Sequence, residues 1–145
     1  MAEQARRDAF ERVLAATATA EAEGLAEILA DDFTAWSPSS SVSSRDELLE
    51  ELRARDAVLS EVVVGIDAMH LVDNRGYAEW VISGVHAGAY EIDDETVVEA
   101  TGNPVTIRGI SVVEFDGGDR ITELRQYWDE VGLLEAIGLL DLDDD

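Results

Sequence analysis

The stretch TGNPVTIRGISVVEFDGGDRITELRQYWDEVGLLEAIGL, residues 101–139, indicates the fold class of the chain. It holds two runs rich in β-branched residues, 105–115 and 120–128, separated by the segment DGGD at 116–119. The two glycines can supply the positive φ that a tight reversal needs, so the runs are predicted to form a hairpin. After Asp129 the hydrophobic period changes from two toward that of a helix.

Asp129 stands at the junction between the second predicted strand and the predicted helix. As an N-cap, its side-chain oxygen would accept a hydrogen bond from an amide of the first helical turn. Alternatively, a carboxylate at a strand end, beside Tyr127 and Trp128 and covered by an apolar helix, could lose its water. Desolvation raises the pKa of a carboxyl group and can make it a base for near-neutral chemistry. Local sequence favours the cap, and the base remains the alternative.

Length and composition indicate one globular domain, residues 1–140, followed by an acidic tail at 141–145. A chain of 145 residues can bury about two-thirds of its unfolded surface, and 46% of its residues are hydrophobic. No apolar run approaches the ~20 residues of a membrane span, and the first residues show no signal-peptide pattern. We therefore expect a cytoplasmic protein. Without cysteine, disulfides and thiolate metal sites are excluded.

The charge is strongly negative. The sequence has 33 Asp and Glu against 10 basic residues, all of them Arg, for a net charge of −23. Such a chain repels phosphate backbones and anionic lipids, so we expect neither nucleic acid nor membrane as a partner. A host with a salty cytoplasm would explain this acidity, and a GC-rich genome would explain the lack of lysine. The composition does not separate the two causes.

The first half of the chain is predicted to be mostly helical. Residues 2–30 have apolar side chains at helix spacing, with Gly24 dividing two helices and Asp31 and Asp32 closing the second. A short strand is expected at 33–36, and the serine-rich segment 37–43 is expected to be a loop. Ser44 and Glu47 form a capping box that opens a helix whose inward side chains extend to Val58 and Leu59.

The second half is predicted to be strands. Residues 61–72 and 77–88 form a hairpin around the turn 73–76, and an acidic connection at 89–103 leads to the hairpin 105–128. Helices followed by a meander of four long strands indicate the α+β class, with an antiparallel sheet and the helices on one side. If such a sheet curves strongly, its concave side can hold a small ligand.

Three pieces of the chain then show a family pattern, in order and at suitable spacing. They are Trp80 with GVHAG at 84–88, ATGNPV at 100–105 with RG at 108–109, and FDG at 115–117 followed by Asp129 and GLL at 132–134. Together with the N-terminal segment they resemble the SnoaL-like polyketide cyclase and ester cyclase branch of the NTF2-like superfamily. The resemblance spans nearly the whole chain, and it implies a cone-shaped sheet with helices packed on its concave side.

The resemblance also implies a homodimer formed through the outer face of the sheet, and a small apolar ligand containing a carbonyl group. The family's acid/base aspartate falls on Asp129, so the resemblance favours the base over the cap and implies that Asp129 points into the cone. There it would abstract a proton next to that carbonyl in a cyclase or isomerase reaction without metal or cofactor. His86 is a candidate second catalytic residue. Trp36, Trp80 and Tyr127 are candidate donors and walls.

The strand 106–114 lacks the histidine that cyclases often keep near the aspartate. Arg108 or Arg125 could replace it, but a permanent cation would lower the pKa of Asp129 and weaken it as a base. Arg108 completes the predicted binding residues. His86 and His70 do not have metal-ligand spacing, so no metal is predicted. Which face of the hairpin points inward stays open. A four-residue loop would put Arg108 on the same face as Tyr127 and Asp129. A bulge at the glycines would instead put Ile107 and Val113 on the same face as Tyr127 and Asp129. The alternative function is a non-catalytic ligand-binding or dimerisation module.

Overall fold

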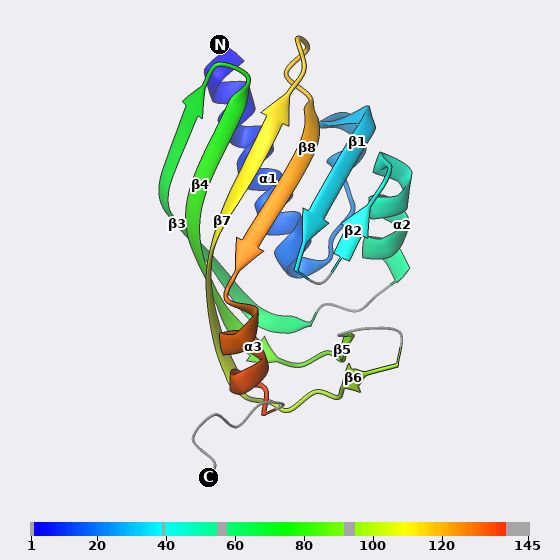
Figure 1. Cartoon of the computed structure of the whole chain (residues 1–145), viewed down its shortest axis with the longest axis vertical. Coiled ribbons are helices and arrows are strands. Elements are labelled where there is room, and N and C mark those ends of the chain that lie inside the picture. Colours follow the sequence, from blue (N-terminus) through cyan, green and yellow to red (C-terminus); the bar gives the residue numbers. More distant parts are fainter. Residues whose placement is uncertain (1, 39, 55–57, 92–94, 139–145) are drawn as a thin grey trace.

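The computed structural model describes residues 2–38, 40–54, 58–91 and 95–138. Figure 1 shows a curved sheet with helices on one side and at its ends. In chain order the elements are α1 (Ala2–Thr19), the short 3₁₀ helix η1 (Leu25–Glu27), β1 (Leu29–Ser37), β2 (Ser40–Val42), α2 (Arg45–Ala54), β3 (Leu59–Val72), β4 (Arg75–His86), β5 (Tyr90–Glu91), β6 (Val97–Val98), β7 (Pro104–Phe115), β8 (Ile121–Trp128) and α3 (Glu130–Ala136). The predicted tail 141–145 lies outside the described residues.

The main sheet has the strand order β2-β1-β8-β7-β4-β3. The four long strands β3, β4, β7 and β8 form the predicted antiparallel meander. β1 joins β8 in parallel, so the sheet is mixed, and the short strands β5 and β6 pair separately. The α+β class with a curved sheet is therefore confirmed.

The hairpin that joins β7 and β8 forms as predicted, but the left-handed position in its turn is not taken by glycine. Asp119 adopts φ +65°, whereas Gly117 and Gly118 are absent from the residues with positive φ. The Asp116 carboxylate accepts hydrogen bonds from the backbone amides of Gly118 (2.8 Å) and Arg120 (3.0 Å). Asp tolerates the left-handed region better than most residues, and an Asx turn closes the loop.

The second predicted helix, at 25–30, is wrong. A single 3₁₀ turn at Leu25–Glu27 is followed at once by β1, so Asp31 and Asp32 lie within a strand. The cause is long-range pairing: Leu29 lies opposite Ile121, whose amide donates to the Ile28 carbonyl at 2.8 Å. These β8 contacts outweigh the local helix propensity.

The serine-rich segment is more ordered than predicted, because β2 pairs antiparallel with the end of β1. The capping box that follows it is confirmed in a shifted form. The Ser44 hydroxyl accepts from the Glu47 amide at 3.1 Å, while Glu47 accepts in return from the Ser43 amide at 3.2 Å. The expected continuation of α2 is wrong at Leu59, which begins β3.

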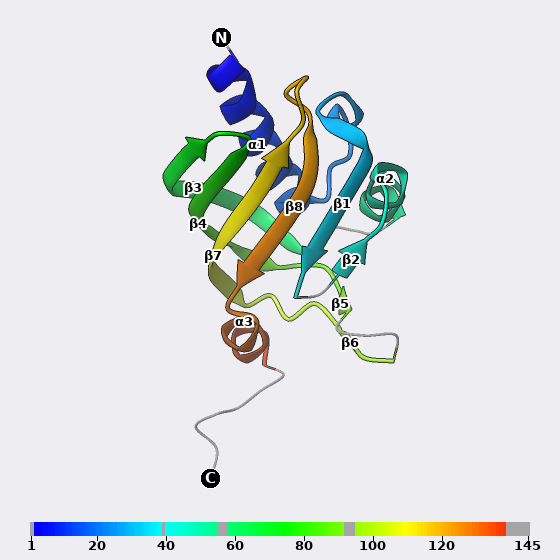
Figure 2. The same cartoon turned by 45° about the horizontal axis from the view of Figure 1, so that its top comes forward.

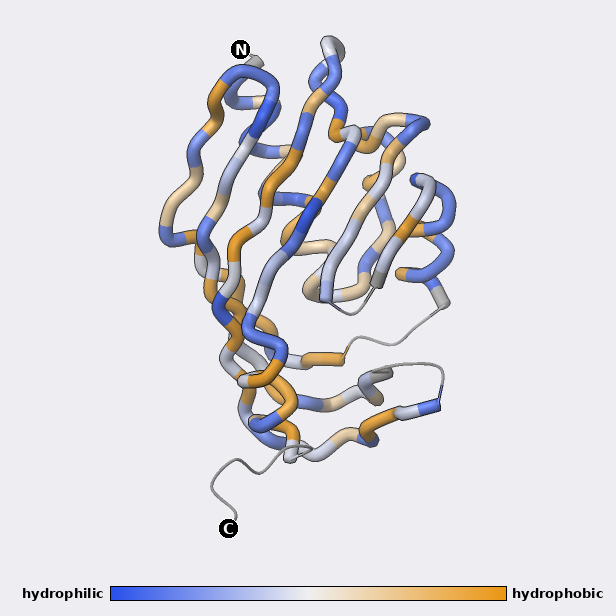
Figure 3. The backbone as a smooth tube through the Cα atoms, viewed as in Figure 1, coloured by the Kyte–Doolittle hydropathy of each residue, from blue (hydrophilic) through white to orange (hydrophobic). Residues whose placement is uncertain are grey.

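The core lies between the concave face of the sheet and α1, which crosses behind the sheet in Figure 1. Phe10, Val13 and Leu14 of α1 are at most 1% exposed, as are Phe33 and Ile121 of the strands. α2 lies along the edge made by β1 and β2, and α3 follows β8 at the far end of the sheet (Figure 2). Hydrophobic and hydrophilic segments alternate along the long strands (Figure 3). None of the helices within the described ranges is long and apolar enough to cross a membrane.

Candidate functional site

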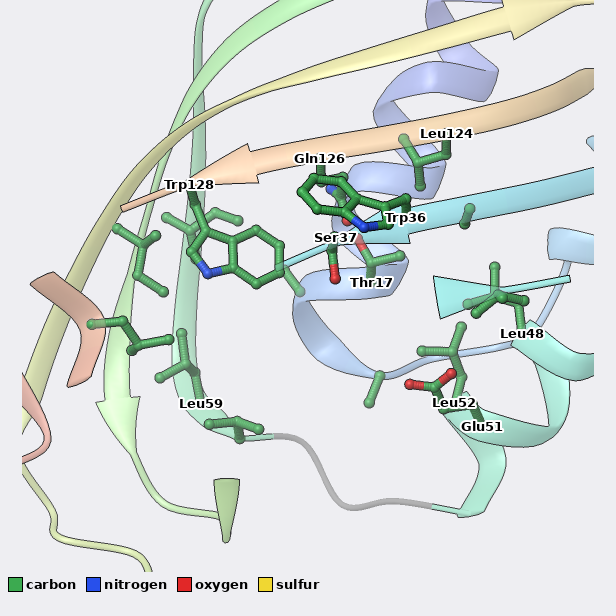
Figure 4. A pocket seen from close by; sticks show the side chains of 18 of the residues that line it. Thr17, Trp36, Ser37, Leu48, Glu51, Leu52, Leu59, Leu124, Gln126 and Trp128 are labelled. Carbon is green, nitrogen blue, oxygen red and sulfur yellow. The ribbon is translucent and has the colours of Figure 1, made fainter. Parts of the chain in front are cut away.

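A pocket of about 150 Å³ opens between the concave face of the sheet and the ends of α1 and α2. Figure 4 shows side chains from α1, α2, β1, β3 and β8 directed into it. Most of its walls are aliphatic or aromatic. The described lining residues are Thr17, Ala18, Ala20, Ala35, Trp36, Ser37, Val42, Leu48, Glu51, Leu52, Val58, Leu59, Trp80, Ile82, Tyr90, Ile107, Leu124, Gln126, Trp128 and Leu133.

The register of the hairpin decides which side chains reach this pocket. Leu124, Gln126 and Trp128 of β8 lie opposite Val113, Ser111 and Gly109 of β7. The three β8 residues all line the pocket. Because successive side chains of a strand point to opposite faces, Tyr127 and Arg125 belong to the outer face.

Gly109 makes room for a pocket wall. A Cβ at this position would lie 2.5 Å from the Trp80 ring and 2.5 Å from the Tyr127 carbonyl oxygen. Only glycine therefore lets the indole of Trp80, which is 3% exposed, lie flat against β7. Trp80 was predicted to be a pocket wall, and it is one of the lining residues.

A buried polar chain runs along the wall next to Trp80. The indole Nε1 of Trp80 donates to the Ser111 hydroxyl at 2.8 Å, and the Gln126 amide nitrogen donates to the same oxygen at 3.2 Å. Ser111 is fully buried and Gln126 is 8% exposed. Sequence reasoning missed both residues. The sequence does contain a sign of their position. Ser111 and Gln126 are each two residues from a buried apolar residue of the same strand, Val113 and Leu124, and residues two apart on a strand point to the same face.

Glu130 hydrogen-bonds two aromatic residues of the pocket wall, Tyr90 and Trp128. Its carboxylate accepts from the Tyr90 hydroxyl at 2.7 Å and from the Trp128 indole at 3.2 Å. Both aromatic residues line the pocket. Sequence reasoning missed Glu130 and Tyr90, because only the fold brings the β5 segment beside the start of α3.

Trp36 is one of the described lining residues, but it lies opposite Arg125 in the pairing of β1 with β8, so its ring belongs to the outer face of the sheet. It is 45% exposed, and its ring centroid lies 5.2 Å from that of Tyr127 at an interplanar angle of 46°. The polar lining residues Thr17, Ser37 and Glu51 come from α1, β1 and α2, and Glu51 is the one charged group in the described lining.

Asp129 is the N-cap of α3. Its carboxylate accepts a hydrogen bond from the Gly132 amide at 2.9 Å, and the residue is exposed. It is not among the described pocket-lining residues. The structure therefore has the local cap geometry, and the expectation that Asp129 points into the cone is not met. Gly132 contributes to the cap, since a Cβ there would lie 2.5 Å from the Asp129 carboxylate.

His86 is fully buried at the end of β4, outside the described lining of the pocket. Its Nδ1 accepts from the Thr101 amide at 3.2 Å and lies 2.9 Å from the Thr101 hydroxyl. Within the described residues its Nε2 has no hydrogen-bond partner. No hydrogen bond in the described part of the chain joins His86 to Asp129, so the expected catalytic pair is not assembled.

Arg108 and Tyr127 lie on the outer face, which is the physical reason that neither lines the pocket. The open question of the hairpin face is thus answered. Arg108 and Tyr127 do share one side, as the four-residue loop predicted, but that side is the outer one, and the register shifts between Glu114 and Phe115 rather than at the glycines. The inner side carries Ile107, Ser111 and Val113.

The outer face also carries a cluster of charges across β7 and β8. Arg125 lies 2.8 Å from the Glu114 carboxylate and also pairs with Glu123. Hydrogen bonds with Glu123 and with Arg125 lower the pKa of Glu114 to about 2. These groups stabilise the sheet surface rather than the pocket. Within the described ranges, no cluster of three His, Asp or Glu side chains could hold a metal ion.

Comparison with known proteins places this geometry in a family. The SnoaL-like domain model matches residues 10–124. No match to a curated protein sequence was found. Among solved structures, the fold is similar to that of a protein proposed to be a SnoaL-like polyketide cyclase from Jannaschia sp. CCS1, with a TM-score of 0.77 and 13% identity over 95% of this chain and 94% of that one.

It is also similar to TsrD from Streptomyces laurentii, with a TM-score of 0.76 and 16% identity over 94% and 97% of the two chains. An LEH-like epoxide hydrolase from M. tuberculosis has a TM-score of 0.67 and 18% identity over 92% and 90%. At these identities the structures show a shared fold alone. The domain match covers most of the chain, and the chain therefore belongs to the SnoaL-like family.

Proposed function

We propose that this chain binds a small, largely apolar molecule with a carbonyl group in the pocket behind its sheet. The observation that carries the proposal is the pocket itself: an open cavity with apolar walls and one buried amide, Gln126, among them. Ligand sites typically combine apolar walls with few polar groups that fix orientation. Two of the similar structures are described as a proposed polyketide cyclase and an epoxide hydrolase, which supports a small-molecule ligand.

Acid/base chemistry at this pocket is a second candidate, favoured by the position of Asp129 between the lining residues Trp128 and Leu133. In this reaction the C–H bond next to the carbonyl breaks. The proton goes to the carboxylate, and the electron pair moves to the carbonyl oxygen as an enolate. Asp129 could act only if its exposed side chain turned into the pocket, whereas Glu51 already lines it.

Hydrogen–deuterium exchange at the α-carbon of acetophenone in D₂O, followed by NMR, tests both parts. If Asp129 is the base, Asp129→Asn abolishes the catalysed exchange and Glu51→Gln preserves it. The reverse result assigns the proton transfer to Glu51. Binding without any catalysed exchange makes the chain a non-catalytic binding module. His86→Gln, measured alongside, tests whether His86 assists the transfer.

We also propose that a second copy of the chain covers the outer face of the sheet. Ile110, Trp36 and Tyr127 are 45–47% exposed there, which is a large apolar exposure for neighbouring strands. A two-fold axis would place the same side chains of both copies together. Light scattering in salt should give twice the chain mass of 15.8 kDa. Ile110→Asp should return the mass to that of one chain, and a single-chain mass for the unaltered protein would contradict the proposal.

A further inference from the structure

Gln126 presents an unused polar group to the pocket. Within the described residues its only hydrogen bond is the one to Ser111, at 3.2 Å. The residue is 8% exposed, and Figure 4 shows it among the side chains that line the cavity. A primary amide has two donors and an acceptor oxygen with two lone pairs, so one bond leaves most of its capacity for a ligand.

The rest of the polar chain holds this amide in place. Ser111 is fully buried, and it also accepts from Trp80 at 2.8 Å. A half-turn of the Gln126 amide would let the Ser111 hydroxyl donate to Oε1 and would turn the NH₂ group toward the cavity. Gln126 can therefore bond a ligand that accepts a hydrogen bond or a ligand that donates one, and only its terminal amide group has to rotate.

The cavity limits the size of the buried part of the ligand. Its volume is about 150 Å³, and apolar cavities of roughly 150 Å³ hold molecules such as benzene. The walls around Gln126 are also held rigidly, because Glu130 bonds both Trp128 and Tyr90. A single ring fits this space, whereas rings fused side by side do not.

The charge of the site excludes anions. Glu51 is the one charged residue in the described lining, and the whole chain carries a net charge of −23. A carboxylate ligand would lose its water in a lining whose described residues include no cation to bind it. A neutral ligand has no such penalty.

We infer that the pocket takes a neutral ligand of single-ring size whose one polar group bonds the Gln126 amide. This inference rests on the proposed binding function and adds to it a recognition residue, a size limit and a charge limit. Gln126 is a specificity-determining residue here, because its amide is held by Ser111 and keeps hydrogen-bonding capacity for a ligand in the pocket.

Four probes of matched chemistry test it, titrated by NMR in KCl. Acetophenone has one ring and a carbonyl, ethylbenzene lacks the oxygen, benzoate replaces the neutral group by a carboxylate, and 2-acetylanthracene fuses further rings. Acetophenone should bind best. Ethylbenzene should bind about fivefold more weakly, since a hydrogen bond contributes on the order of 1 kcal/mol. Benzoate and 2-acetylanthracene should show no saturable binding.

Variants separate the hydrogen bond from the shape. Gln126→Leu should weaken acetophenone to the affinity of ethylbenzene and leave ethylbenzene unchanged. Gln126→Met provides the same test if the leucine variant does not fold. The matched control is Gln4→Leu, which alters the other glutamine of the chain, an exposed one on α1, and should change no affinity.

The outcomes distinguish the inference from the function on which it rests. Equal acetophenone affinity in folded Gln126→Leu, or binding of benzoate or 2-acetylanthracene as tight as that of acetophenone, overturns the inference and leaves the binding function standing. Failure of all four probes to bind the folded protein overturns the proposed function and the inference together.

Discussion

The two faces of the β7–β8 hairpin come from alternate residues of the same strands, yet they differ in almost every property. On the inner face, Ser111 and Val113 are fully buried and Gln126 is 8% exposed. On the outer face, Ile110 and Tyr127 are 45% and 47% exposed and lie beside the charged cluster around Arg125. The inner face is apolar with one amide, and the outer face is aromatic and charged.

This difference shows where a polar residue carries information about function. A charged side chain on the outer face costs little, because water and neighbouring charges solvate it. A polar side chain on the inner face must be hydrogen-bonded, or its burial destabilises the fold. Gln126 is only partly satisfied by Ser111 and faces a cavity, so it is the stronger candidate for contact with a ligand.

The largest expected effect comes from shortening one side chain on each face of the hairpin to alanine. Leu124 is 2% exposed, and Leu124→Ala should lower the free energy of unfolding by about 2–5 kcal/mol through lost burial and a cavity. Ile110→Ala on the outer face should change it by about 0.5 kcal/mol or less at protein concentrations at which the chain is a monomer, because nothing else then covers that side chain. Urea denaturation measures both. An added loss for Ile110→Ala that appears as the protein concentration rises would support the proposed dimer interface, and a loss as large as that of Leu124→Ala at every concentration would contradict the contrast between the two faces.

The next largest effect is expected from adding a methyl group to the tightly packed inner face. Gly109→Ala should cost about 1–3 kcal/mol, because its Cβ would meet the Trp80 ring and the Tyr127 carbonyl. Gly117→Ala in the hairpin turn is the matched control, since nothing lies within 4 Å of its Cβ position. Thermal melts of the two variants should therefore differ. Equal melting temperatures would show that the indole of Trp80 can shift away from β7.

The junction at Asp129 should respond as a helix cap. Asp129→Ala should destabilise the protein by about 1 kcal/mol, while Asp129→Asn should be nearly neutral, because asparagine caps about as well as aspartate. The observed bond to the Gly132 amide is the basis of this expectation. Denaturant midpoints compare the variants. Identical midpoints for Asp129→Ala and the unaltered protein would refute the cap as a source of stability.

The smallest effect belongs to the outer charge cluster. The pKa of Glu114 is lowered from its ordinary 4.5 to about 2, chiefly by its hydrogen bonds with Glu123 and Arg125. Because the folded pKa lies below the unfolded one, the carboxylate stabilises the fold above about pH 4.5 and loses this contribution as the pH falls toward 2. Glu114→Gln should therefore be less stable than the unaltered protein at pH 6 and equal to it near pH 2. A difference that stays constant over this range would exclude the linkage.

Much of the fold could be predicted from local patterns. The hairpins around 73–76 and 116–119, the capping box at Ser44 and the cap at Asp129 each depend on a few adjacent residues, and all of them form. The predicted helix at 25–30 failed because pairing of Leu29 with Ile121 across the sheet competed with it. Local propensities are worth fractions of a kcal/mol per residue, and such long-range contacts can override them.

The candidate site could be predicted only in part. Trp80 was predicted as a wall and lines the pocket, whereas the rings of Trp36 and Tyr127 and the Arg108 side chain lie on the outer face. A shift of one residue exchanges the two faces of a strand, and the sequence of the turn left this parity open. Gln126 was therefore overlooked in favour of its neighbour.

The sequence by itself determined the alternating strands, their turns, the helix caps and the acidic surface, because these depend on nearby residues and on composition. Only the tertiary structure decided that Gln126 and Trp128 face inward, that Glu130 meets Tyr90, and that His86 bonds Thr101 outside the described pocket lining. Those relations join segments far apart in the chain. They exist only after the sheet has curved and its register has been set, and no local energy term specifies them.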